Sequence, residues 1–182
     1  MKKLVTTFLI LAIIFAFTAA TATAEPARNV TATVDPGITI TLNGVSQGLR
    51  NAQGESVYPI LYGGSTYLPL RAIASLLGVQ VDWHPDGFQW ATGRIIHLQR
   101  GGQAQSFPAT QSQSTRQVQA TIDPGVRIFF DGAIEIMRDA NRNQVHPLMF
   151  EGTTYLPVRA VAEILDLSIN WVAATRTVQI TI

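Results

Sequence analysis

The chain contains no cysteine, and its only two lysines stand at positions 2 and 3. The lack of cysteine excludes disulfide bonds, a cysteine nucleophile and anchoring through a lipid-carrying cysteine. Charged residues are few, and no basic run follows the first three positions, so the sequence does not indicate a nucleic-acid surface. The protein must therefore derive its stability from buried cores or from the docking of one unit on another.

The N-terminus has the pattern of a secretory signal peptide. Met1–Lys3 is basic, the apolar run that follows ends at Phe17, and Ala22–Ala24 is a small-residue cleavage site. The alternative is a membrane anchor, but the apolar run is short for a span of about 20 residues. We predict a signal peptide at residues 1–24, no stable membrane insertion after cleavage, and a secreted or cell-wall-associated protein.

One stretch of the sequence occurs twice. Ser65–Trp83 returns 88 residues later as Thr153–Trp171, and the same spacing aligns Val30–Gly44 with Val118–Gly132. A repeat of this regularity indicates one supersecondary unit that is used twice.

Each copy predicts one short helix followed by a strand. Pro69 and Pro157 suit the first helical position, because proline has a fixed φ and no N–H to leave unpaired. Gly78 and Asp166 stand where a left-handed residue ends a helix. Between them, apolar residues recur at helical spacing: Leu70, Ile73, Ala74 and Leu77 in the first copy, and Val158, Val161, Ala162 and Leu165 in the second. The alternation that follows predicts a half-buried strand ending on a tryptophan.

Turn signals such as Asp35–Gly37 and Asn43–Gly44 separate further short strands in each copy. We therefore predict an α+β fold of two tandem units at residues 30–99 and 118–182. Each unit is expected to be an antiparallel sheet of about five strands packed around one α-helix. Residues 100–117, rich in Gln, Ser, Thr, Gly and Ala, are predicted to be a flexible linker.

The repeated motif has the form Gly-x-Thr-Tyr-Leu-Pro-[Leu/Val]-Arg-Ala-[Ile/Val]-Ala and leads to a strand that ends on tryptophan, at Gly64–Trp83 and Gly152–Trp171. It resembles the copper amine oxidase N-terminal-like domain, or stalk domain, of secreted bacterial proteins. The resemblance implies a small antiparallel sheet around one helix and a non-catalytic accessory module, since copper and the quinone cofactor belong to a separate catalytic domain. The His-x-His pair and the Asn-Tyr pair of that catalytic domain do not occur in this sequence. We expect no cofactor and no enzymatic activity.

Five residues are candidates for binding: Arg71, Arg159, His84, Phe88 and Trp90. The two arginines hold the same helix position, and a guanidinium group binds a carboxylate of a wall polymer or partner. Alternatively, they are structural and pair with an acid or stack on a nearby aromatic ring. The other three lie in an insertion, His84–Trp90, which the second copy lacks. Such loops often carry binding sites, although this one alternatively covers a sheet edge or the other unit.

Trp83 and Trp171, with the tyrosines, suggest a sugar-stacking platform, but their phase favours the core. The three histidines lack the spacing of metal ligands, and the chain has neither a Gly-x-Ser-x-Gly motif nor a phosphate-binding loop.

The leading functional prediction is a secreted, non-catalytic module of the bacterial envelope that acts in binding or as a spacer. Its expected partner is a cell-wall polymer or an envelope protein, and not nucleic acid. Two alternatives stay open. One is a secreted enzyme that acts on wall polymers through a site between the two units. The other is a self-assembling protein whose exposed strand edges pair between copies and produce oligomers.

Overall fold

The computed structural model describes residues 25–89, 91–109, 114–139 and 141–182. The predicted signal peptide and Trp90 lie outside the described residues. The first repeat forms β1 (Arg28–Val34), β2 (Thr39–Leu42), β3 (Val45–Gln47), β4 (Ile60–Tyr62), β5 (Ser65–Pro69), α1 (Leu70–Leu77), β6 (Val79–His84), β7 (Gly87–Phe88), β8 (Ala91–Thr92) and β9 (Ile95–Arg100). The second forms β10 (Arg116–Ile122), β11 (Arg127–Phe130), β12 (Ala133–Glu135), β13 (Leu148–Phe150), β14 (Thr153–Pro157), α2 (Val158–Leu165), β15 (Ser168–Val172), the 3-10 turn η1 (Ala173–Thr175) and β16 (Thr177–Thr181).

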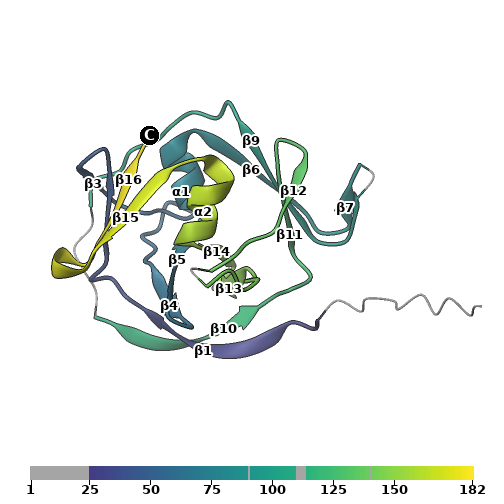
Figure 1. Cartoon of the computed structure of the whole chain (residues 1–182), viewed down its shortest axis with the longest axis horizontal. Helices are drawn as coiled ribbons and strands as arrows, with labels where there is room; N and C mark the ends of the chain where they lie inside the picture. Colours follow the sequence, from purple (N-terminus) through teal and green to yellow (C-terminus); the bar gives the residue numbers. More distant parts are fainter. Residues whose placement is uncertain (1–24, 90, 110–113, 140) are drawn as a thin grey trace, which may run out of the picture.

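Six strands, three from each repeat, close a small barrel in the order β1-β10-β13-β14-β5-β4. Strands β1 and β10 pair in antiparallel fashion along their whole length and form one wall of the molecule in Figure 1. Thr31 faces Gln119 at the middle of this pair, and Leu68 faces Leu156 between β5 and β14. Each of these residues pairs with its own counterpart, so an internal pseudo-twofold axis relates the two repeats.

The two repeats also exchange their last strands. Strand β9 of the first repeat pairs in parallel with β11 of the second, and β16 of the second pairs in parallel with β2 of the first. Two four-stranded sheets result, β12-β11-β9-β6 and β15-β16-β2-β3, and each contains strands of both repeats. Every large sheet of the fold is therefore shared between the repeats.

The predicted fold class is thus wrong. The described chain is mostly β-strand with two short helices, and its sheets are not two separate units wrapped around a helix. Each repeat is small and supplies too few strands to cover its own helix, so the strands of both combine around shared cores. A repeat in the sequence is not here a separate body in space.

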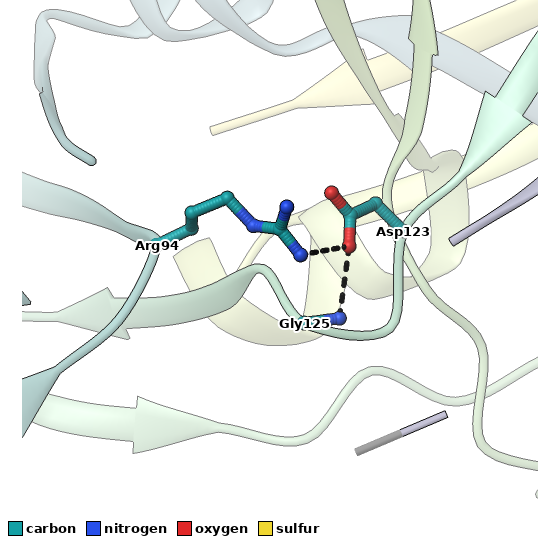
Figure 2. A network of polar contacts seen from close by, with 3 residues as sticks. All are labelled: Arg94, Asp123 and Gly125. Carbon is teal, nitrogen blue, oxygen red and sulfur yellow. Dashed lines mark hydrogen bonds and ion pairs between the residues drawn. The ribbon is translucent and has the colours of Figure 1, made fainter. Parts of the chain in front are cut away.

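Two equivalent ion pairs connect the exchanged strands to the opposite repeat. Arg94, just before β9, donates from Nη2 to Oδ1 of Asp123 at 2.8 Å, and the backbone N–H of Gly125 donates to the same oxygen at 3.0 Å (Figure 2). At the equivalent place Arg176 pairs with Asp35. Both carboxylates are buried. The Asp-Pro-Gly turns predicted from the sequence therefore also bind an arginine from the other repeat.

Both helices end where the sequence predicts and begin one residue after the predicted prolines. Pro69 and Pro157 precede them, and Gly78 (φ 65°) and Asp166 (φ 54°) end them in the left-handed conformation. The helices lie between the two four-stranded sheets (Figure 1), and their apolar residues join one core with residues of both sheets. Because partners lie on several sides, α1 buries Ala72 and Leu76 in addition to three residues of the predicted stripe, whereas Leu77 is only partly buried.

The strands of the barrel enclose a second core of aliphatic side chains and two tyrosines. Tyr67 and Tyr155, which are equivalent in the two repeats, are both buried in it. Burial raises the pKa of the Tyr67 phenol to about 12 and raises that of Tyr155 further. The two tyrosines stand at the repeat spacing, and their side chains therefore fill equivalent places in the barrel core.

Part of the predicted linker lies against the first repeat. The backbone N–H of Gly48 donates to the carbonyl of Phe107 at 2.8 Å, that of Gln105 donates to the carbonyl of Ser75 at 2.8 Å, and the Ser106 hydroxyl donates to Gln47 at 2.7 Å. The domain boundaries remain a prediction. None of the helices in the described residues has the length and apolar character needed to cross a membrane.

Candidate functional site

Two surface hollows are built from equivalent residues of the two repeats. The first groove, of about 400 Å³, is lined among others by Asn51, Gln53, Arg71, Trp83, Thr153 and Thr154. The second groove, of about 360 Å³, is lined among others by Ser65, Thr66, Asp139, Arg159 and Trp171. In each groove the arginine and tryptophan come from one repeat, whereas the hydroxyl side chains come from a hairpin of the other. A single repeat therefore does not contain a complete groove.

The grooves are related by the pseudo-twofold axis. Arg71 corresponds to Arg159, Trp83 to Trp171, and the Thr153–Thr154 pair to Ser65–Thr66, all at the repeat spacing. The duplicated fold thus produces two copies of one site. What singles this site out is the exposure of its tryptophans, because large apolar side chains are usually buried.

Trp83 and Trp171 were predicted to lie in the core, and this prediction is wrong. They are 41% and 46% exposed. The reason is topological: β6 and β15 are the edge strands of their sheets, so the far ends of these strands lack a covering neighbour. The alternation of residues along the strand had favoured burial over a sugar-stacking platform. The observed exposure agrees better with the platform than with burial. An exposed indole offers a flat apolar face next to polar groups.

Both candidate arginines line these grooves. Arg71 is exposed, and its Nη1 donates to the carbonyl of Val81 at 3.2 Å, which holds the side chain across β6 beside Trp83. Within the described part of the chain, no ion pair or cation–π contact is found for Arg71 or Arg159. The structural alternative, pairing with an acid or stacking on an aromatic ring, is thus not what the described residues show.

The two grooves differ in one loop. In the first repeat, the Asn51 side-chain amide donates to Glu55 Oε2 at 2.8 Å. In the second, the order is reversed: Oδ2 of Asp139 accepts from the Asn143 amide at 3.1 Å. The carboxylate therefore lines the second groove directly, whereas an amide occupies this place in the first. The hydrogen bond from Asn143 lowers the pKa of Asp139, and the charge of Arg159 adds to this effect.

The insertion of the first repeat forms a third hollow, which we call the insertion pocket. It measures about 360 Å³ and is lined among others by Phe88, Ala91, Ile95, His97, Arg100 and Phe129. His84 stacks on Phe88 with a centroid distance of 4.4 Å, and the rings of Phe88 and His97 are 5.0 Å apart. The structure therefore brings His84 and Phe88 together, away from both candidate arginines. The lateral position of β7 is visible in Figure 1.

Sequence reasoning missed His97 and the hydroxyl residues of the grooves. His97 is buried, and its Nδ1 lies 2.9 Å from Gln99 Nε2. Its alternation with Ile95 and Gln99 along β9 places the three on one face of the sheet, a signal available in the sequence. Thr153 and Ser65 follow predicted turns, but their contribution to the opposite groove depends on the pairing of β5 with β14, which the sequence does not reveal.

Neither the grooves nor the pocket resemble a metal centre. In the ranges that the structure describes, no three His, Cys, Asp or Glu residues are grouped so that they would hold a metal ion. Comparison with curated proteins and with solved structures gives no match. A family model does match part of the second repeat, from the loop before β13 through β13, β14, α2, β15 and η1 to β16. Through residues 137–182, the chain is similar to the copper amine oxidase N-terminal domain.

Proposed function

We propose that the protein is an exported, non-catalytic module of the bacterial envelope that binds a wall polysaccharide through its two grooves. The observation that carries this proposal is an exposed tryptophan beside an arginine that forms no ion pair among the described residues, present in both grooves. The similarity to an N-terminal domain of copper amine oxidases supports an accessory role. The pattern of residues 1–24 supports export.

The chemistry of the grooves suits a sugar chain. An indole face packs against the C–H face of a pyranose ring, while guanidinium, amide and hydroxyl groups bond the ring oxygens and hydroxyls. The first groove offers all three kinds of polar group around Trp83. Because two grooves belong to one shared fold, a long polymer that reaches both gains avidity without a strong single site.

The experiment that tests the proposal is co-sedimentation of residues 25–182 with purified, insoluble cell-wall material. The variants are Trp83→Ala, Trp171→Ala and the double substitution. The matched control is Ile134→Ala, which removes an exposed apolar side chain on β12 away from both grooves. We expect each single variant to bind several-fold more weakly, in the range of one stacked ring, and the double variant to bind at background. Wild-type binding by the double variant would refute the proposal.

Self-assembly is a second candidate function that the strand edges favour. Strands β3 and β12 are edges of the two four-stranded sheets, and exposed apolar residues stand on or beside them, namely Val45, Ile134 and Ile136. Exposed apolar edges are sites where further strands add. Light scattering over a range of concentrations tests this: an assembling wild type should increase in mass with concentration, and Ile134→Lys should not.

The enzymatic alternative has no comparable support. Most glycoside hydrolases use two carboxylates that face each other across a cleft. The second groove is lined by one carboxylate, Asp139, and the insertion pocket by one, Asp131. The buried pair Asp35 and Asp123 is engaged by arginines at two separate places in the fold.

A further inference from the structure

We infer that the two grooves select sugars of different charge: the first groove binds a sugar unit that carries a carboxylate, and the second binds a neutral unit. This inference rests on the proposed function and specifies the ligand of each groove. It comes from the place where the equivalent grooves differ in charge, the loop that begins at Asn51 in the first repeat and at Asp139 in the second.

The first groove contains the Arg71 guanidinium, which has more N–H donors than its contact with Val81 uses. A guanidinium has five N–H donors in a planar fork, and the contact with the Val81 carbonyl occupies Nη1 of Arg71. The groove lining next to it includes the uncharged side chains of Asn51 and Gln53 but not Glu55. A ligand carboxylate that enters this groove therefore meets Arg71 without a competing carboxylate in the lining, and a two-point contact is the geometry that arginine favours.

The second groove already contains its carboxylate. Oδ1 of Asp139 accepts from the backbone N–H groups of Asn141 and Asn143 at 2.8 and 2.9 Å, and Oδ2 accepts from the Asn143 side chain. These donors keep Asp139 ionised, and Arg159 is close enough to contribute to the same effect. A second carboxylate in this groove would be repelled by Asp139, whereas sugar hydroxyls find both a donor and an acceptor.

Within the hydrogen-bonded pair of side chains, the difference is one of position and not of charge, although the second loop also carries Arg142 where the first has Gly54. Each loop holds one amide and one carboxylate that are hydrogen-bonded to each other, in opposite order. The order Asn51–Glu55 keeps the negative charge out of the groove lining, and the order Asp139–Asn143 places it there. A pair of substitutions that reverses the order in one loop therefore moves the carboxylate without altering the net charge of the protein.

This property permits a charge-neutral test on residues 25–182. The first variant, Asn51→Asp with Glu55→Asn, gives the first groove the arrangement of the second. The matched reciprocal variant, Asp139→Asn with Asn143→Glu, does the opposite. Arg71→Gln and Arg159→Gln test the two arginines separately. Far-ultraviolet circular dichroism and thermal melting of each variant establish that it is folded.

The probes are short oligosaccharides, measured by titration calorimetry at low and at physiological salt. Hexagalacturonate carries the carboxylate on the sugar ring, a peptide-free glycan-strand fragment carries it on a lactyl ether, and cellohexaose is neutral. Binding of either acidic probe supports the inference, and the tighter of the two identifies the source of the carboxylate.

We expect the wild type to bind one acidic oligosaccharide per chain. Reversal of the first loop, or Arg71→Gln, should weaken this binding about tenfold, as for loss of a charge-assisted pair. Reversal of the second loop should raise the number of acidic sites from one to two, and Arg159→Gln should leave acidic binding unchanged. Equal losses from Arg71→Gln and Arg159→Gln, or no effect of the first reversal, would overturn the inference.

Failure of the inference and failure of the proposed function are distinguishable. If the tryptophan variants abolish binding to wall material but all probes bind both grooves equally, only the assignment of charge is wrong. If wall binding persists in the double tryptophan variant, the proposed function is wrong and this inference fails with it.

Discussion

Arg176 and Asp35 lie 141 residues apart in the sequence and form an ion pair that joins the end of one repeat to the beginning of the other. Their counterparts, Arg94 and Asp123, form the same contact at 2.8 Å. Each arginine directly precedes a strand that pairs in parallel with the other repeat, and the backbone N–H of Thr39 donates to the Arg176 carbonyl beside the ion pair. The two contacts therefore fix the register of the exchanged strands.

Loss of one of these arginines should destabilise the protein measurably. Arg94→Met leaves the buried Asp123 carboxylate with the N–H of Gly125 but without its charged partner. We expect the free energy of unfolding to fall by about 2 kcal/mol, because an unpaired buried carboxylate loses hydration without compensation. Urea denaturation measures this change.

The matched control for Arg94→Met is Glu151→Gln, which removes the ion pair between Arg116 and Glu151 at the surface. Both side chains of this pair are largely exposed. Exposed pairs contribute roughly 0–1 kcal/mol, so the control should change little. If the two variants proved equally stable, the ion pair at Asp123 would not hold the exchanged strands.

The two consecutive leucines at the end of α1 should differ in their contribution to stability. Leu76 is buried, whereas Leu77 is only partly buried at the edge of the same core. Leu76→Ala should lower the free energy of unfolding by about 3 kcal/mol, as for a leucine removed from a packed core. Leu77→Ala should cost about 1 kcal/mol, since less apolar area returns to water. Chemical denaturation of both variants ranks them, and a greater loss at Leu77 would contradict the observed packing.

The phenol groups inside the barrel should ionise only at unusually high pH. Burial raises the pKa of Tyr67 to about 12, so the folded state disfavours its charged form and stability falls as the pH rises above the ordinary value of about 10. A spectrophotometric titration should show an absorbance step near pH 12, and this step should shrink in Tyr67→Phe. Loss of absorbance near pH 10 instead of near pH 12 in this variant would place the Tyr67 phenol in contact with water.

Local structure followed from the sequence because its signals are short-range. Pro69 and Gly78 bound the first helix as expected, since each restricts only its own backbone and that of its neighbours. The partner of each strand did not follow, because alternation along β9 is equally compatible with a neighbour from either repeat. For the same reason the sequence identified Arg71 but assigned Trp83 to the core: its exposure depends on β6 being an edge strand.

The candidate site, too, could be predicted from the sequence only in part. Motif repetition identified Arg71 and Arg159, and the insertion identified His84 and Phe88, but none of these patterns shows that Thr153 lies opposite Trp83 in one groove. That juxtaposition arises from the pairing of β5 with β14 across the pseudo-twofold axis. The pairing of strands between the repeats thus determines which residues line the same groove.

The last prediction concerns His146, which stands in the second repeat where the first has Tyr58. The His146 side chain is half-buried just before β13, and desolvation by burial lowers its pKa below the ordinary value of about 6.5. The fold therefore favours the neutral imidazole. Stability should be fully present above pH 6.5 and should fall as the pH drops from there through the lower pKa of the folded state.

His146→Tyr removes this titration while it introduces the side chain that the other repeat already accommodates. Urea denaturation of the wild type and of the variant between pH 5 and 8 measures the effect, and the difference between the two curves isolates His146 from all other titrating groups. We expect the stability of the variant to depend less steeply on pH below 6.5 than that of the wild type. A steeper dependence in the variant would mean that the folded state stabilises the charged imidazole, contrary to its burial beside Pro147 and β13.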